Sequence, residues 1–376
     1  MGKPKICFVS MNMYHLLTRQ QGARGMGGGE LQVLLIAREL VARGYPVSFI
    51  TLAYDPGEIQ EDLPFPLIPS YSKQDGWPVL RFFYPRMYRL WKALQQSVDA
   101  DIYYMNMASY ILAPLVYFAR KHGKKVLFAG AIDTDFEPEH LPVPTWKDRR
   151  MYCWGLRRCD AYVVQHRQQQ QALMQNFRRE GRIIYYGLPP APDPQEERAH
   201  ILWVASIKRK KHPELFVELA RRHPAEKFVL VGGVPPKGDD DQHRLFEEVQ
   251  AAARQVPNLT LKGFLPFEEA AREFARAKLF INTSDLEGFP TTYLQAWQRG
   301  VPVISFVNPD DLINPNRLGK VVKNLDEMSA ALRDFSDGKL QFSNAHIEQF
   351  FQAHFTIQAA VDQYEKVFRS VLEINS

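Results

Sequence analysis

The chain has 376 residues, and at about 150 residues per domain this length suggests two domains. Hydrophobic residues make up 45% and charged residues 24%, which excludes disordered, collagen-like and disulfide-scaffold proteins. The net charge of +5 favours phosphate groups or an anionic membrane surface as partners, and we expect no nucleic-acid partner. The cysteines lack C-x-x-C spacing and the histidines lack H-E-x-x-H spacing, so neither predicts a metal site.

The apolar runs of the chain are short. Residues 6–9 form too short a run for a secretion signal and predict a first strand. The longest apolar stretch, residues 110–119, has about half the length needed to span a bilayer. We therefore expect a cytoplasmic protein, and a peripheral position at the inner membrane face is left open.

Short β-branched and aromatic runs alternate with helical patterns along the whole chain, which predicts β/α units and buried parallel sheets. Four prolines fall within residues 189–194 and interrupt this alternation. We predict domains over 1–188 and 200–354, a linker over 189–199, and a final segment over 355–376 that contains a helix. The predicted strands are 5–10, 47–53, 101–105, 125–129, 161–165 and 183–186 in the first domain, and 201–206, 227–231, 259–262, 279–282 and 301–305 in the second.

A glycine run follows the first predicted strand. Gly27, Gly28, Gly29 and Glu30 stand directly before a helical pattern, where backbone N–H groups can approach an anion closely. The plainer interpretation is a flexible loop that enters a helix. The chain has no G-x-G-x-x-G fingerprint after this strand and no P-loop sequence. The main sequence evidence for a dinucleotide oxidoreductase or a P-loop nucleotidase is therefore missing.

A cluster of bases follows the first strand of the second domain. Residues 208–211 are Lys-Arg-Lys-Lys, and a β-to-α turn at the carboxyl end of a strand lies where ligands bind in such sheets. Lys208 and Lys211 are our candidates for neutralising a diphosphate. The alternative interpretation is a solvated run of charge.

A carboxylate and a glycine turn follow the predicted strand 279–282. Glu287 precedes Gly288, and a helix then begins whose free N–H groups can receive phosphate. Gln295 lies about one turn further into that helix and can reach a sugar hydroxyl or a ribose. In the plainer interpretation Glu287 caps the helix start and Gly300 ends the helix.

Together these three motifs resemble family four of the glycosyltransferases, in matching order and over nearly the whole chain. The resemblance rests on Gly27-Gly28-x-Glu30, on Lys211-x-Pro213-Glu214, and on Glu287-Gly288-Phe289-Pro290 through Gly300-Val301-Pro302-Val303, with Tyr186-Gly187 in place of the usual Asn-Gly. It implies an α/β fold of the GT-B class, with two Rossmann-like doubly wound domains that face an interdomain cleft. It also implies an acceptor site on the first domain, a nucleotide sugar held mainly by the second, and a carboxy-terminal helix that crosses back to the first domain.

Three positions depart from the family pattern. Gln295 replaces the second carboxylate, which is usually assigned to the nucleotide ribose, and an amide still donates and accepts hydrogen bonds. Ser206 stands where an arginine is usual, and Lys208 is the candidate substitute. Ile132 stands where a histidine is often found, and Asp133 follows it as a candidate catalytic residue.

The resulting site has two sets of residues and no metal ligands. We expect catalysis to depend on Glu287, Lys211 and Asp133. We expect the nucleotide-sugar donor to be bound by Gly27, Gly28, Gly29, Lys208, Lys211, Gly288, Phe289, Pro290, Thr291, Thr292 and Gln295.

Two D-x-D patterns, residues 133–135 and 239–241, raise the alternative of a metal-dependent glycosyltransferase. Such triplets are common by chance, and a one-domain metal-dependent fold does not explain the second β/α series, so we expect no metal. A basic and aromatic stretch over residues 77–92 suits a membrane interface, sugar stacking or a lipid acceptor. We favour a helix whose aromatic face packs on the sheet.

The sequence therefore predicts a retaining, metal-independent, hexosyltransferase-type enzyme. Its donor would be a nucleoside-diphosphate sugar with UDP or GDP, and its acceptor a glycan, a glycolipid or a small molecule, with no cofactor beyond the donor. The alternatives are a catalytically silent sugar-nucleotide-binding or scaffold protein of the same fold, and a GT-B sugar-nucleotide epimerase.

Overall fold

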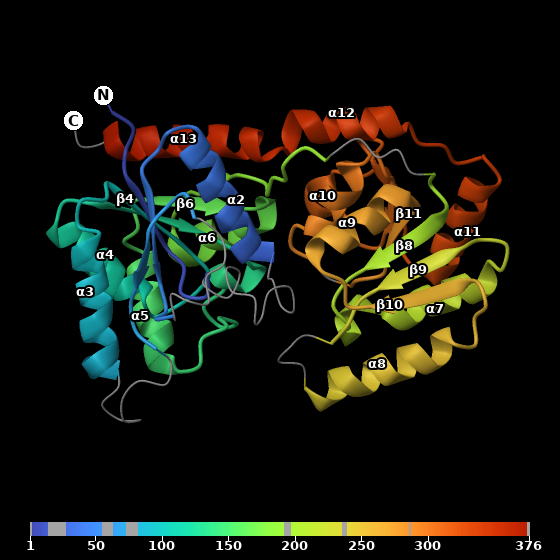
Figure 1. Cartoon of the computed structure of the whole chain (residues 1–376), viewed down its shortest axis with the longest axis horizontal. Helices are drawn as coiled ribbons and strands as arrows, with labels where there is room; N and C mark the ends of the chain where they lie inside the picture. The colour runs from blue at the N-terminus through green and yellow to red at the C-terminus, as the bar shows by residue number, and fades with distance from the viewer. Residues whose placement is uncertain are drawn as a thin grey trace. The chain divides into compact units, whose positions relative to one another are not determined.

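The computed structural model describes residues 2–13, 28–54, 63–72, 82–191, 197–234, 239–285 and 287–373. Gly27, part of the predicted glycine site, lies outside these ranges. The described residues form two compact units. Unit 1 contains residues up to Gly187 and resumes at Ile357, and unit 2 contains Leu188–Thr356. Each unit is a parallel sheet with helices packed on it (Figure 1).

The sheet of unit 1 has seven parallel strands in the order β3-β2-β1-β4-β5-β6-β7. Successive side chains of a strand point to opposite faces, and here both faces are buried. Cys7 and Val9 contribute to the core on one face, whereas Ile6 and Phe8 contribute to the core on the other. The strands are β1 (Ile6–Val9), β2 (Val47–Thr51), β3 (Leu67–Pro69), β4 (Ile102–Asn106), β5 (Lys125–Ala129), β6 (Ala161–Val164) and β7 (Arg182–Ile183).

The last helix of the chain, α13 (Ile357–Glu373), belongs to unit 1 and packs against α2 (Gly28–Ala42) (Figure 1). Val361 and Phe368 enter the same core as Ile36 of α2. At the surface Arg43 pairs with Asp362 at 2.6 Å. The other helical segments of this unit are η2 (Phe82–Met87), α3 (Tyr88–Gln96), α4 (Leu112–Lys121), η3 (Asp133–Phe136), α5 (Trp146–Leu156) and α6 (Arg167–Phe177).

The sheet of unit 2 has six parallel strands in the order β10-β9-β8-β11-β12-β13. They are β8 (His200–Val204), β9 (Phe228–Val231), β10 (Leu259–Gly263), β11 (Ala277–Asn282), β12 (Val303–Ser305) and β13 (Gly319–Val321). The helical segments are η4 (Arg209–Lys211), α7 (Pro213–Arg222), α8 (Asp240–Ala253), α9 (Phe267–Arg276), α10 (Thr291–Trp297), η5 (Pro309–Asp311), α11 (Leu325–Ser336) and α12 (Asn344–His354).

The predicted strands form, but the sheets also contain two short strands that the sequence pattern did not predict. These are β3 and β13, which have three residues each and lie at sheet edges. β3 contains Pro69 and β13 begins at Gly319, and both residue types are depleted in strands. The strand predicted over 183–186 is shorter than expected, since β7 covers only Arg182–Ile183.

Strand order determines where each sheet can bind a ligand. In unit 1 the order reverses between β1 and β4, and in unit 2 it reverses between β8 and β11. Ligands of doubly wound sheets bind outside the carboxyl ends of the strands at this reversal. In unit 2 a ligand is therefore expected to bind at the loops that follow β8 and β11. No helix within the described residues has the length and apolar character needed to cross a membrane.

Candidate functional site

The two motifs predicted in the second domain meet at the strand-order reversal of unit 2. The basic turn follows β8, and the turn that contains Glu287 follows the neighbouring strand β11. Thr283, just after β11, donates a hydrogen bond to the carbonyl of Lys211 at 2.7 Å and accepts one from Trp203 Nε1 at 2.9 Å. The N–H of Asp285 donates to the carbonyl of Lys210 at 3.1 Å. These bonds fix one turn against the other.

Lys211 and Glu287, the two predicted catalytic residues of this domain, form a direct ion pair through Nζ and Oε1. Both side chains are 14% exposed. Ser284 Oγ also donates to Glu287 Oε1, at 2.7 Å. Burial lowers the pKa of Lys211, and the Glu287 carboxylate opposes that shift. The site therefore holds a half-buried ammonium group beside a single carboxylate.

A second charge cluster flanks this pair. His212 has a left-handed backbone (φ 46°) at the start of α7 and contacts Asp285 through Nε2 at 2.5 Å and Glu214 through Nδ1 at 2.8 Å. Burial lowers the pKa of His212, but the hydrogen bonds to both carboxylates outweigh burial and leave it raised. The two carboxylates thus favour the protonated form of His212, which lies next to Lys211 in the sequence.

The remaining predicted donor-binding residues of unit 2 differ in exposure. Lys208 is half-buried, and its carbonyl accepts the N–H of Lys211 at 2.9 Å, so both lysines belong to one turn. Gly288, Thr291 and Thr292 are half-buried around the start of α10. The other three are buried: Phe289, whose ring packs on Phe355 at 5.6 Å, Pro290 at the helix start, and Gln295 within α10.

In unit 1, Asp133 lies beyond the carboxyl end of β5 and contacts a histidine that the sequence analysis missed. His166 Nε2 lies 2.6 Å from Asp133 Oδ1, and Gln169 Nε2 donates to the same oxygen at 3.1 Å. His166 is buried, whereas Asp133 keeps 25% of its side chain exposed. Ile132, at the position of the family histidine, is 44% exposed. An imidazole is thus present at this edge, but it comes from the loop after β6.

Asp135, the other carboxylate of the first D-x-D pattern, is committed to the backbone. It is fully buried and accepts N–H groups from Ala131 at 2.7 Å, Ile132 at 3.1 Å and Ala108 at 3.1 Å. Burial raises the pKa of Asp135 to about 6, although these three hydrogen bonds oppose the shift. Asp135 therefore holds the loop that presents Asp133.

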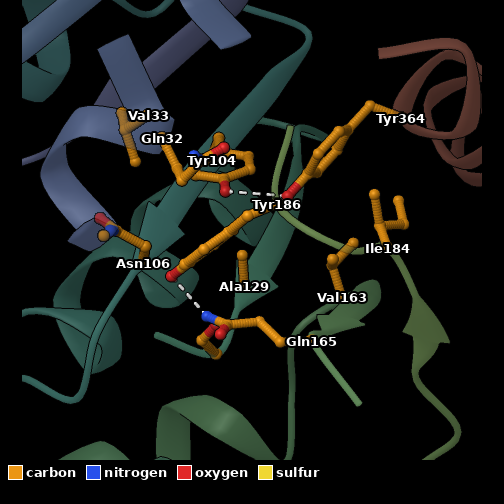
Figure 2. Close-up of a pocket in the computed structure, with 12 residues that line it drawn as sticks. Gln32, Val33, Tyr104, Asn106, Ala129, Val163, Gln165, Ile184, Tyr186 and Tyr364 are labelled. Atoms are coloured by element: carbon orange, nitrogen blue, oxygen red, sulfur yellow. Dashed lines mark hydrogen bonds between the residues drawn. The ribbon is translucent and has the colours of Figure 1, made fainter. Parts of the chain in front are cut away.

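A pocket opens beside these residues, under the start of α2 (Figure 2). The Tyr186 hydroxyl accepts a hydrogen bond from Gln165 Nε2, and Tyr104 bonds Tyr364 of α13 at 3.2 Å between hydroxyl oxygens. Gln32 is 1% exposed; its Oε1 accepts the N–H of Gly187 at 3.0 Å, but its Nε2 has no hydrogen-bond partner among the described residues. The lining residues are Gly29, Gln32, Val33, Tyr104, Asn106, Ala129, Gly130, Val163, Gln165, Ile184, Tyr186 and Tyr364.

The second D-x-D pattern has structural partners. Asp239 caps α8 by accepting the N–H of Gln242 at 2.9 Å, and Asp241 forms a two-bond ion pair with Arg209 at 2.6 and 2.7 Å. Among the residues that the structure describes, no three His, Cys, Asp or Glu side chains gather in a way that suits a metal ion.

The aromatic stretch over 77–92 is described from Phe82 onward. In α3, Leu90 and Leu94 are buried in the core, and the ring of Trp91 packs edge-on against Phe118 at 5.0 Å. Tyr84 and Tyr88, however, are 69% and 59% exposed, so the prediction that the aromatic face of this stretch packs on the sheet is not met by these two residues. Residues 77–81 lie outside the described residues.

Comparison with known proteins identifies the family. Residues 26–191 match the model described as Glycosyltransferase Family 4, and residues 198–337 match the model described as Glycosyl transferases group 1. The chain is a family 4 glycosyltransferase-like protein. The resemblance inferred from the three motifs is thereby confirmed.

Among characterised relatives, the Vi polysaccharide biosynthesis protein VipC/TviE of Salmonella typhi is 30% identical over 148 residues. This match spans 33% of the present chain and only 24% of that protein. It is therefore a local similarity.

Solved structures resemble the chain over nearly its full length. Sucrose-phosphate synthase from Thermosynechococcus elongatus has a TM-score of 0.72 at 19% identity, covering 99% of this chain and 100% of that one. Anabaena HepE in complex with UDP and glucose has a TM-score of 0.71 at 14% identity, covering 98% and 100%. At such identities the likeness concerns the fold, and it confirms the predicted GT-B class.

Proposed function

We propose that the chain is a metal-independent, retaining glycosyltransferase of hexosyl type that uses a nucleoside-diphosphate sugar. The observation that carries the proposal is the Lys211–Glu287 ion pair at the strand-order reversal of unit 2. It joins the two sequence motifs that resemble the donor site of the family. Lys211 and Glu287 are also close enough to act on one small ligand.

The diphosphate is the part of the donor that the basic turn suits. Charge-assisted hydrogen bonds from ammonium groups to phosphate are stronger than neutral ones, and Lys208 and Lys211 present two ammonium groups on one turn. The backbone N–H groups of Gly288, Phe289, Thr291 and Thr292, around the start of α10, add donors for the same phosphates. As the glycosidic bond to phosphate breaks, negative charge develops on the diphosphate, and these groups stabilise it.

Glu287 has a separate role in this proposal. Lys211 neutralises its carboxylate, so a phosphate that binds the ammonium group releases the carboxylate for another partner. Sugar hydroxyls are suitable partners, since they donate hydrogen bonds that tighten as positive charge develops at the anomeric carbon. Gln295 is assigned to the nucleotide side of the donor.

Unit 1 supplies the acceptor side. Asp133, held by His166 and Gln169 at the carboxyl edge of the sheet, is the candidate catalytic group there. The pocket under α2 is small, and its phenol and amide groups, including the Nε2 of Gln32 that has no partner among the described residues, can bind at most one hydroxyl group of a saccharide acceptor. Gly27, Gly28 and Gly29 remain candidates for contact with the donor phosphates, since α2 begins at Gly28.

The proposal includes no metal and no cofactor beyond the donor. Lysine side chains and helix N–H groups supply the positive charge that a metal would otherwise provide. The carboxylates of both D-x-D patterns have protein partners, as Asp135 binds three N–H groups and Asp241 binds Arg209.

The proposed setting is polysaccharide or glycolipid assembly at the cytoplasmic side of a membrane. The polysaccharide biosynthesis protein of Salmonella typhi supports this setting as a relative. A uridine nucleotide is the first donor to test, because Anabaena HepE was solved with UDP and with UDP-glucose. A GDP sugar is the second.

A thermal-shift screen of the full chain over nucleotides and nucleotide sugars, followed by an assay for released nucleoside diphosphate, tests the proposal. A ligand that binds only the folded chain raises its melting temperature. We expect one nucleoside diphosphate and its sugar to do so, and the sugar to be transferred to a saccharide acceptor. Binding without turnover would support the silent binding protein instead, and conversion of the donor to an epimeric sugar nucleotide, with no acceptor and no release of nucleoside diphosphate, would support an epimerase. The proposal is refuted if the chain shows no binding of any nucleotide or nucleotide sugar and no turnover.

A further inference from the structure

The outer surface of α5 carries a regular row of aromatic and basic side chains. Trp146, Arg150, Trp154 and Arg158 follow one another at four-residue spacing, which places them on one side of a helix and the turn after it. We call these four residues the α5 row. Trp146 is 65% exposed and Trp154 is 38% exposed. The guanidinium of Arg150 lies 5.8 Å from the ring centre of Trp146, and that of Arg158 lies 4.4 Å from the ring centre of Trp154.

Basic side chains outnumber acidic ones within the segment that contains the α5 row. Residues 145–159 contain five basic side chains and one acidic one, a net charge of +4 in a chain whose total is +5. Within the described residues none of the five bases forms an ion pair, and Asp148 instead accepts a hydrogen bond from Thr145 at 2.8 Å. Arg209 and Arg222 of unit 2, by contrast, pair with Asp241 and Asp326.

The inner face of α5 explains why its outer face is free for another role. Tyr152 and Leu156 are fully buried, and Tyr152 donates to the carbonyl of Asp135 at 2.7 Å. A Cβ atom at Gly155 would lie 2.8 Å from a backbone atom of Leu112, so α5 packs tightly on α4 (Figure 1). The helix is therefore anchored by its other side, and exposed tryptophans contribute little to that packing.

We propose that the α5 row docks this chain on a membrane surface rich in anionic phospholipid. Tryptophan rings favour the boundary between headgroups and acyl chains, and clustered Lys and Arg side chains are attracted to anionic headgroups. Both residue types alternate within one row on a helix that is too firmly packed to leave the protein. The contact is therefore shallow, with side chains entering the interface while α5 stays in place. This inference does not depend on the proposed transferase activity.

Vesicle flotation tests the docking surface directly with the full chain. One set of vesicles contains phosphatidylcholine alone, and the other contains phosphatidylcholine and phosphatidylglycerol in equal parts. We expect binding to the second set only, weakened by added salt because exposed charges are screened. Arg150→Gln with Arg158→Gln should weaken binding about 30-fold, since each basic residue contributes about 1 kcal/mol at an anionic surface. Trp146→Ala with Trp154→Ala should also weaken it.

Matched variants in unit 2 keep the test specific. Arg254→Gln with Arg317→Gln changes the net charge equally at two exposed positions, and should bind the anionic vesicles as the unaltered chain does. Melting temperatures and nucleotide binding of all variants report folding and the donor site separately, and should be unchanged. The proposal is overturned if the chain does not float with anionic vesicles, or if the α5 variants and the unit 2 control bind equally. Binding to a soluble acidic polysaccharide but not to vesicles would also overturn it.

Discussion

The carboxyl edges of the two sheets have the same kind of strand reversal but hold charge in different ways. In unit 2, Lys211 and Glu287 pair with each other and each keeps 14% of its side chain exposed. In unit 1, Asp135 is fully buried and accepts three backbone N–H groups. A charge paired with another movable charge can exchange its partner for a ligand, whereas a charge paired with the backbone maintains the loop. This contrast is consistent with the donor chemistry that we propose for unit 2 and with a scaffold role for Asp135.

The largest expected effect concerns the scaffold role of Asp135. Asp135→Ala leaves three backbone N–H groups without their acceptor, and each unsatisfied buried group costs about 1–3 kcal/mol. We expect the free energy of unfolding of the chain, measured in urea at neutral pH, to fall by about 3 kcal/mol or more. Asp99→Ala, which removes an exposed partner of Lys5, should cost about 1 kcal/mol or less. Equal losses in the free energy of unfolding for the two variants would contradict the scaffold role of Asp135.

Glu287→Gln tests the exchangeable pair. This substitution keeps the shape of the side chain but removes its charge, and should lower turnover by about 10²-fold, as expected for one preorganised electrostatic contact. Steady-state kinetics with the identified donor measure this effect. Turnover near that of the unaltered chain would show that Glu287 does not contact the reacting sugar.

Lys211→Ala tests whether Lys211 contacts the phosphates of the donor. Removing a charged hydrogen bond should weaken nucleoside-diphosphate binding by about 1.5–3 kcal/mol. Lys208→Ala should act in the same direction. Calorimetric titration with the nucleotide measures both changes, and Lys339→Ala, at an exposed site in unit 2, is the control. Unchanged affinity for the Lys211 variant would move the phosphate site elsewhere.

Gln295→Ala should have a smaller effect, confined to donor binding. Gln295 lies buried in α10, beyond the turn that contains Glu287. Its loss should raise the donor KM by about tenfold or less with kcat little changed, since lost uniform binding appears in KM. Gln295→Glu should be tolerated. A large fall in kcat for Gln295→Ala would reverse the assignment of sugar and nucleotide sides.

The smallest expected effect is a pH dependence at His212. Its pKa is raised in the folded chain by Asp285 and Glu214, so protonation stabilises the fold. This contribution is complete below the unfolded pKa of about 6.5 and is lost as the pH rises through the folded value. The difference in melting temperature between the unaltered chain and His212→Gln should therefore shrink between about pH 6 and pH 9. A difference that grows with pH would contradict the ion pairs seen at this turn.

The sequence revealed the linear motifs of the site better than its spatial contacts. Lys211 and Glu287 were predicted because each stands in a recognisable turn after a strand, and their meeting required only that β8 and β11 be neighbours. His166 was missed because it lies 33 residues from Asp133, and only the pairing of β5 with β6 brings the two together. The strands β3 and β13 were missed because three residues carry too weak a pattern.

Hydrogen–deuterium exchange of the full chain, with and without saturating nucleoside diphosphate, tests most directly whether unit 2 holds the donor at its strand reversal. Bound nucleotide should slow amide exchange in residues 206–214 and 282–292, which contain Lys211 and Glu287. The strongest protection should fall in these two segments. Protection confined to residues 28–36 and 130–136 of unit 1, with none in residues 206–214, would contradict this assignment.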